Sequence, residues 1–139
     1  MNKSFQLFLF STLSILLISA AIYIFVFSER TDANDDLTVD EILNLSVDIS
    51  EITTNLSSDH YIQIAFKVQT DSKEAKEELE KREFQVNNLI IKYISGMDAE
   101  EIDGTEGKIE LEQTLKDKIN AILQNGKVEQ VYITSCIIQ

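Results

Sequence analysis

The sequence predicts an α+β fold, in which a single N-terminal transmembrane helix is followed by a small domain of order β-β-α-α-β. Three observations predict it. No charged residue occurs between Ser4 and Ser28. Segments after residue 45 alternate apolar and polar residues, as half-buried strands do, and later segments repeat apolar residues at the helical period. We divide the chain into a cytoplasmic N-terminus (1–4), a transmembrane helix (5–27), a linker (28–44) and an extracytoplasmic domain (45–139).

The uncharged stretch is long enough to cross a membrane. At about 1.5 Å per residue it reaches roughly 37 Å, and the hydrocarbon layer is about 30 Å thick. A cleavable signal peptide is the alternative, with Lys3 as its positive region, but the apolar run continues through residues 22–27, beyond the usual length of such a peptide. We expect a retained anchor formed by Phe5, Leu9, Leu13, Leu16, Leu17, Ile22, Tyr23 and Phe27.

The charges that flank the span predict its orientation. Lys3 precedes it, and residues 29–41 contain six acidic residues and only one basic residue, Arg30. Positive flanks stay in the cytoplasm. We therefore expect a single-pass protein of the inner or plasma membrane, with its N-terminus inside and its domain outside, in a periplasm or on a Gram-positive exterior.

The chain is strongly acidic. It has 24 acidic and 12 basic residues and a formal net charge of −12. A field of that sign repels nucleic acids and anionic headgroups, so we expect no nucleic-acid partner. The charge suits either protein partners with basic patches or simple solubility. Cys136 is the only cysteine, so the chain has no internal disulfide.

Two strands open the predicted domain. Thr38 and Glu41 match a capping box, which predicts a short helix over residues 41–43. The first strand changes its apolar phase between Ile49 and Ile52, which predicts a bulge near residues 50–51. The second strand, near residues 61–69, alternates regularly and forms a hairpin with the first. Its core face is predicted to carry Ile62, Ile64, Phe66 and Val68.

A helix is predicted next, with Asp71 as its N-cap. Its first half is highly charged and contains opposite charges four residues apart: Lys73 and Glu77, Glu77 and Lys81, Glu78 and Arg82. Its second half carries an apolar stripe that we expect to dock on the sheet: Val86, Leu89, Ile90, Tyr93, Ile94 and Met97. A stop is expected at Gly96 or Asp98.

A second helix is predicted over residues 106–124, ending at Asn125-Gly126. The last strand is predicted over residues 128–138. Regular alternation puts Val131, Ile133 and Ile137 on one face, and the other face carries Tyr132, Cys136 and Ile138. Because both faces are apolar, we expect a central position in the sheet.

No pattern of catalytic residues occurs. His60 is the only histidine, and no second histidine or cysteine accompanies it at a metal-ligand spacing. Residues 103–108 lack the phosphate-loop pattern because Ile109 follows Lys108. We therefore expect no enzyme activity, no metal and no cofactor. The classes left are an interaction module and a structural or sensory anchor.

Short motifs resemble one family over almost the whole chain, the flagellar basal-body-associated protein FliL. Their order and spacing carry the resemblance, which rests on Asn55, Leu56, Gly107, Lys108, Asn120, Gly126, Tyr132 and Gln139. The family's usual proline and basic–acidic pair are absent, since residues 84–88 read Phe-Gln-Val-Asn-Asn. We therefore do not expect the contacts that the proline and the basic–acidic pair make in other members of the family.

The resemblance implies a fold related to the stomatin-like SPFH domain and assembly into a homo-oligomeric ring around the MotA–MotB stator. It implies a non-catalytic role at the flagellar basal body, in flagellar rotation, torque, chemotaxis and swimming or swarming motility. A membrane anchor or sensory module unrelated to the motor is the alternative. Basic residues on a neighbour or on the stator are expected to meet the charged half of the first helix, unless that face is only solvated: Glu74, Glu77, Glu78, Glu80, Arg82 and Glu83.

Overall fold

The computed structural model describes residues 37–139, in which Thr38–Gln139 form one compact unit. The predicted membrane span, its orientation and most of the linker lie outside the described residues. No helix within residues 37–139 has the length and apolar character that crossing a membrane requires.

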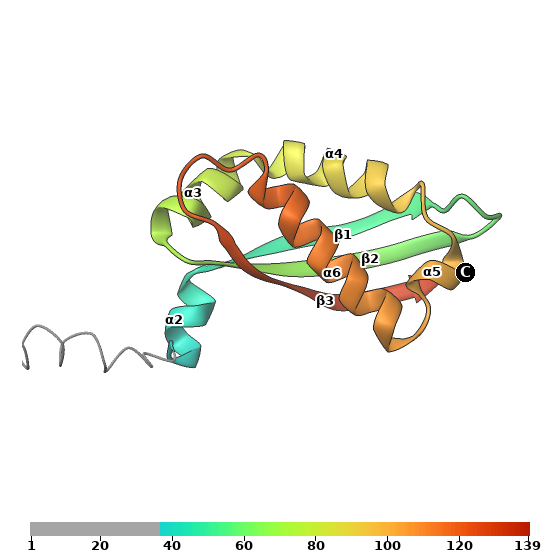
Figure 1. The fold of residues 1–139 in the computed structure, drawn as a ribbon, viewed down its shortest axis with the longest axis horizontal. Helices are drawn as coiled ribbons and strands as arrows, with labels where there is room; N and C mark the ends of the chain where they lie inside the picture. Colours follow the sequence, from blue (N-terminus) through green and yellow to red (C-terminus); the bar gives the residue numbers. More distant parts are fainter. Residues whose placement is uncertain (1–36) are drawn as a thin grey trace, which may run out of the picture. The chain divides into compact units, whose positions relative to one another are not determined.

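The domain is a three-stranded sheet with helices packed on it, so the α+β class is confirmed (Figure 1). Helices α4 and α6 lie over the same face of the sheet, α4 against β1 and α6 against β3. The elements in order are α2 (Val39–Asn44), β1 (Ser46–Asn55), β2 (Tyr61–Thr70), α3 (Lys73–Lys81), α4 (Glu83–Ile94), α5 (Ala99–Ile102), α6 (Gly104–Asn120) and β3 (Val128–Ile138).

The predicted hairpin and its bulge are confirmed. β1 and β2 pair antiparallel, and their register shifts between Ile49 and Ile52. The shift keeps the apolar residues on both sides of it on the face that the helices cover, because Ile49 lies opposite Phe66 and Ile52 lies opposite Ile64. The predicted core face of β2 is almost fully buried.

The prediction for the last strand is wrong in position and in facing. The strand order is β1-β2-β3, so β2 is central and β3 is an edge strand. The register shifts between Ser135 and Ile133, which leaves Thr134 unpaired. This second bulge restores the phase, so that the residues packed toward the core are Val131, Ile133, Cys136 and Ile138, with Tyr132 and Ile137 exposed on the open face.

The first predicted helix is two helices. Ser72, not Asp71, is the N-cap of α3, and its hydroxyl oxygen accepts a hydrogen bond from the Ala75 amide at 3.2 Å. At Arg82 the backbone takes φ −96° and ψ 11°, which ends α3 and begins α4. The apolar stripe of the second half packs as predicted, with Val86, Ile90 and Ile94 buried.

Helices α2 and α6 also differ from prediction at their ends. Asp98 caps the one-turn helix α5 through a capping box with Glu101. The second long helix, α6, begins at Gly104 and ends at Asn120, earlier than predicted at both ends. The short helix before β1 has the predicted capping box, in which Glu41 and Thr38 bond reciprocally. The hydrogen bonds from Thr38 lower the pKa of Glu41, and the bond from the Thr38 backbone amide has the largest effect.

Candidate partner-binding surface

Helix α3 presents a charged surface, on which Lys73 and Lys81 are exposed beside the glutamates, because only one of its sides packs on the domain. Ala75 and Leu79 are fully buried and fix the inner side. Glu74, Glu77 and Glu80 are exposed on the remainder, and Glu83 follows at the start of α4. We call these four glutamates the acidic face.

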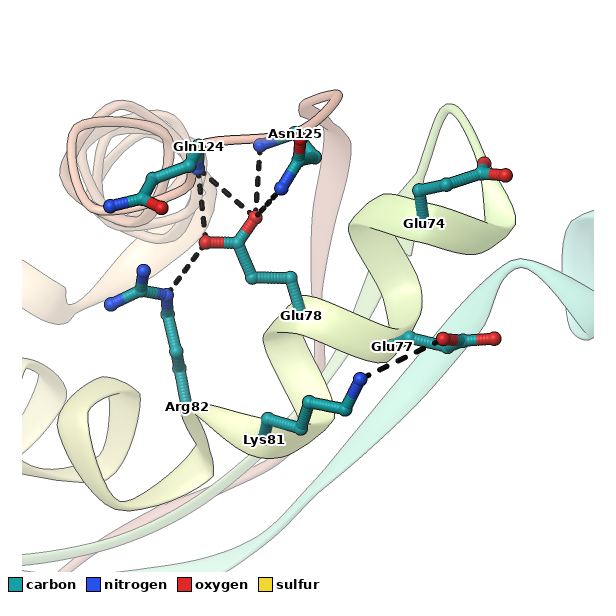
Figure 2. Close-up of a pocket in the computed structure, with 7 residues that line it drawn as sticks. All are labelled: Glu74, Glu77, Glu78, Lys81, Arg82, Gln124 and Asn125. Carbon is teal, nitrogen blue, oxygen red and sulfur yellow. Dashed lines mark hydrogen bonds and ion pairs between the residues drawn. The ribbon is translucent and has the colours of Figure 1, made fainter.

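A hollow of about 560 Å³ lies beside the acidic face, between α3 and the turn that joins α6 to β3 (Figure 2). Glu74, Glu77 and Lys81 line it from α3, and Gln124 and Asn125 line it from the turn. The Lys81 ammonium lies 3.8 Å from a Glu77 oxygen, so this predicted ion pair is present. Lys76 pairs with Glu80 at 3.9 Å, whereas the predicted pair of Lys73 with Glu77 is not formed within the described residues.

Glu78 also lines this hollow, and its carboxylate is hydrogen-bonded to other residues of the domain. Its carboxylate accepts hydrogen bonds from the Arg82 Nε at 2.7 Å, from the Gln124 amide at 3.0 Å and from the Asn125 amide at 2.9 Å. The Asn125 side chain donates another at 3.2 Å. Figure 2 shows the carboxylate turned toward this turn, with Arg82 on its other side.

These bonds keep the carboxylate ionised. Burial alone would raise the pKa of Glu78, but the hydrogen bonds from Asn125, Arg82 and Gln124 outweigh it and lower that pKa to about 2. The Glu78 side chain is only 12% exposed, and that of Arg82 is 25% exposed. Both groups are therefore satisfied inside the domain, and the acidic face is the part of the predicted contact set that is open to a partner.

A second carboxylate holds the same turn. Asp71 Oδ1 accepts hydrogen bonds from the Lys127 amide at 2.9 Å and from the Ser72 hydroxyl at 3.0 Å. Gly126, which directly precedes Lys127, has φ +66°. A Cβ at this position would lie 2.5 Å from Asp71 Oδ1 and 2.8 Å from Ala75 Cβ. The turn thus fits against the start of α3 only with glycine at this position.

The other motif residues hold backbone segments together. The Asn120 side chain joins the end of α6 to β3, since its Nδ2 donates to the Val128 carbonyl at 3.2 Å and its Oδ1 accepts from the Val128 amide at 2.7 Å. At Gly107, a Cβ would collide with the Glu101 carbonyl oxygen of α5. Lys108 donates to the Gly104 carbonyl at 3.2 Å.

Near the ends of the strands, Leu56 is buried, and the Asn55 side chain donates to its carbonyl at 3.2 Å. Gln139 exchanges two backbone hydrogen bonds with Tyr61, at 2.8 and 2.9 Å. The Tyr132 hydroxyl is 3.0 Å from Gln69 Oε1. Each motif residue in the described domain therefore has a contact within the fold.

The residues that carry chemistry in other proteins are scattered here. His60 lies in the exposed turn before β2, with its Nδ1 3.3 Å from the Ser58 hydroxyl. No group of three or more His, Cys, Asp or Glu side chains within residues 37–139 is arranged to hold a metal. Burial raises the pKa of the half-buried Cys136 thiol, against a smaller opposing effect of Lys108.

Sequence reasoning predicted the pair of Glu78 with Arg82 but missed the attachment of Glu78 to residues 124–125. The two partners are more than forty positions apart in the chain, and two of the donors are backbone amides, which leave no side-chain signal.

Comparison with known proteins gives a consistent result. Residues 46–139 match the family model of the flagellar basal body-associated protein FliL. The flagellar protein FliL of Bacillus subtilis (strain 168) is 51% identical over 112 residues, which cover 81% of this chain and 79% of that protein. The flagellar protein FliL of Aquifex aeolicus (strain VF5) is 32% identical over 79 residues, which cover 57% of this chain and 49% of that protein.

Proposed function

The chain belongs to the FliL family of flagellar basal-body-associated proteins, and we propose that it supports the torque of the flagellar motor by non-catalytic association with the stator. In this proposal an N-terminal span anchors it in the cell membrane, its domain lies outside, and copies assemble laterally around MotA/MotB-type proteins. Swimming and swarming motility depend on that support.

The acidic face is the observation that carries the proposal. Four glutamates are exposed on α3 and at the start of α4, and the Glu78 contacts hold α3 against the α6–β3 turn. Complementary charge steers a partner and fixes its orientation more than it adds affinity. An acidic face that is fixed in position therefore suits a basic surface on a neighbouring membrane protein.

Charge reversal tests this role. Replacing Glu74, Glu77 and Glu80 by lysine should reduce the swarming rate and the recovery of stator proteins after cross-linking, with the chain still folded and membrane-bound. The matched control reverses Glu100, Glu106 and Glu110, which are also exposed and change the net charge equally. Glu78 is excluded from both sets because its reversal would disturb the turn.

Two results would overturn the proposal. One is normal motility of the triple variant on the acidic face. The other is an equal loss in the control variant, which would assign the effect to overall charge. Deletion of the gene should impair swimming or swarming but leave filament synthesis intact, which separates support of the motor from a role in flagellar assembly.

A further inference from the structure

A groove lies between α4 and α6, which contact each other on the same face of the sheet (Figure 1). It consists of two neighbouring hollows of about 490 and 460 Å³, and both are lined by Lys92 and Tyr93. The apolar side chains along it are those of Leu89, Tyr93 and Met97, which belong to the core or pack against it. The groove therefore has a firm apolar floor.

The two ends of the groove carry opposite charges. Lys92 and Lys118 line the first hollow, where the Lys118 ammonium lies 4.9 Å from the centre of the Tyr93 ring. Glu101 and Glu110 line the second. Lys92, Lys118 and Glu110 are exposed, and none of the three forms an ion pair within residues 37–139. Charges of both signs are thus open to a partner.

Gly96 keeps the second hollow open, although the backbone does not require glycine there. Its φ is not positive, unlike that of Gly104 and Gly126. A Cβ at Gly96 would have two neighbours within 4 Å among the described residues, the carbonyl oxygens of Tyr93 and Lys92 at 3.5 and 3.9 Å, which are ordinary contacts. The fold would accept a larger residue, so the missing side chain leaves room that the domain itself does not use.

From the open groove and its separated charges we infer that it binds one amphipathic helix of a different protein, with an acidic and a basic residue two turns apart beside an apolar stripe. Lys118 and Glu110 are eight residues apart on α6, which is about 12 Å along the helix. Residues seven apart in a partner helix span about 10.5 Å and lie on one face. Apolar grooves commonly recognise helices in this way.

The acidic end distinguishes this partner from a polyanion. Glu101 and Glu110 would repel a nucleic acid or an anionic polymer that entered at the lysine end, as would the net charge of −12. A helix with both signs matches both ends, and complementary charge fixes its orientation. The groove shares no residue with the hollow beside the acidic face, so the inference does not depend on the proposed function.

Fluorescence anisotropy with a labelled peptide tests the inference on the full-length chain in nanodiscs. The probe is a stapled helix of about twenty residues, with a leucine stripe and with one glutamate and one lysine seven residues apart beside it. A control peptide of the same composition carries the two charges on the opposite face. The probe should bind about tenfold more tightly than the control, because only the probe can form both ion pairs.

Variants of the chain make the test specific. Lys118→Glu should weaken binding of the probe about tenfold, because repulsion replaces an ion pair. A peptide with lysine in place of its glutamate should then restore binding. The matched control is Lys116→Glu, which makes the same change on the same helix outside the groove. Gly96→Leu should block binding, whereas Gly96→Ala should change it little, and circular dichroism checks each fold.

Photo-cross-linking in cells tests the nature of the partner. A photo-reactive amino acid at Asn88, which lines the first hollow, should capture a different protein through a helix that carries the charge pair. Lys118→Glu should reduce this cross-link, and exchange of the partner's acidic residue for lysine should restore it.

Several results would overturn the inference: equal binding of the two peptides, equal effects of the Lys118 and Lys116 variants, unchanged binding after Gly96→Leu, or capture of this chain itself, within one copy or between two. The chain with Glu74, Glu77 and Glu80 replaced by lysine separates the two proposals, because it should bind the probe normally. Normal motility of that chain overturns the proposed function alone. Failure of the wild-type chain to bind the probe overturns this inference alone.

Discussion

Glu78 connects the two parts of the chain that shape the hollow, because its one carboxylate accepts hydrogen bonds both from Arg82, directly after α3, and from the α6–β3 turn. Charge-assisted bonds of this kind are stronger than bonds between neutral groups. The contact is intramolecular, so its main effect is on the fold and on the placement of the acidic face.

The pKa of Glu78 gives a test with a defined sign. The folded-state pKa is about 2 and the ordinary value is 4.5, so folding favours the ionised form. This contribution is fully present above about pH 4.5 and is lost as the pH falls through about 2. Glu78→Gln should lower the melting temperature at pH 7, and its difference from wild type should shrink as the pH approaches 2.

Glu74→Gln is the matched control, because it removes the same charge from an exposed position of the same helix. Circular dichroism melting curves between pH 2 and pH 7 provide the measurement. A constant difference between wild type and Glu78→Gln over that range would contradict the assignment, as would an equal effect of Glu74→Gln.

The glycines allow a second test at the scale of single residues. Gly126 and Gly104 both have positive φ, but a Cβ at Gly104 meets nothing within 4 Å. Gly104→Ala should therefore cost only the strain of a left-handed backbone at a residue with a Cβ, about 1–2 kcal/mol of unfolding free energy. Gly126→Ala adds crowding against Asp71 and Ala75, so we expect it to cost at least about 1 kcal/mol more. Equal losses in urea denaturation would argue against a tight fit of the turn.

At the scale of the elements, the sequence predicts what depends on local periodicity. β2 alternates regularly, and its core face was predicted residue by residue. The bulge in β1 was predicted because apolar residues on both sides of Ile49 and Ile52 show the change of phase. In β3, apolar residues occur at both parities, so the extra residue at Thr134 is hidden from any alternation rule.

Elements that depend on distant contacts were predicted less well. No proline or glycine marks the break between α3 and α4 at Arg82. The Arg82 side chain instead donates hydrogen bonds to the side chains of Glu78 and Gln85. The acidic residues of the candidate surface were predicted from charge alone. Glu78 bonds inside the domain because the α6–β3 turn lies against α3. The sequence does not predict that position of the turn.

The facing of β3 can be measured with two alanine variants. Ile138 packs against the core and Ile137 is 47% exposed. Ile138→Ala should therefore cost about 1–2 kcal/mol of unfolding free energy, since the side chain is only partly buried. Ile137→Ala should stay within about 0.5 kcal/mol of wild type. The reverse order in urea denaturation would support regular alternation and contradict the bulge at Thr134.

At the scale of the whole molecule, a net charge of −12 opposes close approach of two copies. The proposed lateral assembly of copies around the stator must overcome that repulsion. In dilute solution the loss of translational freedom on association adds a further cost of several kcal/mol. Confinement of the copies to one membrane reduces that cost and changes no contact in the domain.

The contribution of the anchor can be separated from that of the domain by replacing one and keeping the other. Removal of residues 1–36 should leave the circular dichroism spectrum of the domain unchanged but abolish the recovery of stator proteins after cross-linking. Fusion of the same domain to an unrelated single membrane span should restore that recovery, because confinement raises the effective concentration whatever the sequence of the span. Equal recovery without any span would show that the domain contacts suffice alone. Recovery that returns only with the native span would place the association within residues 1–36, and the acidic face would then not carry it.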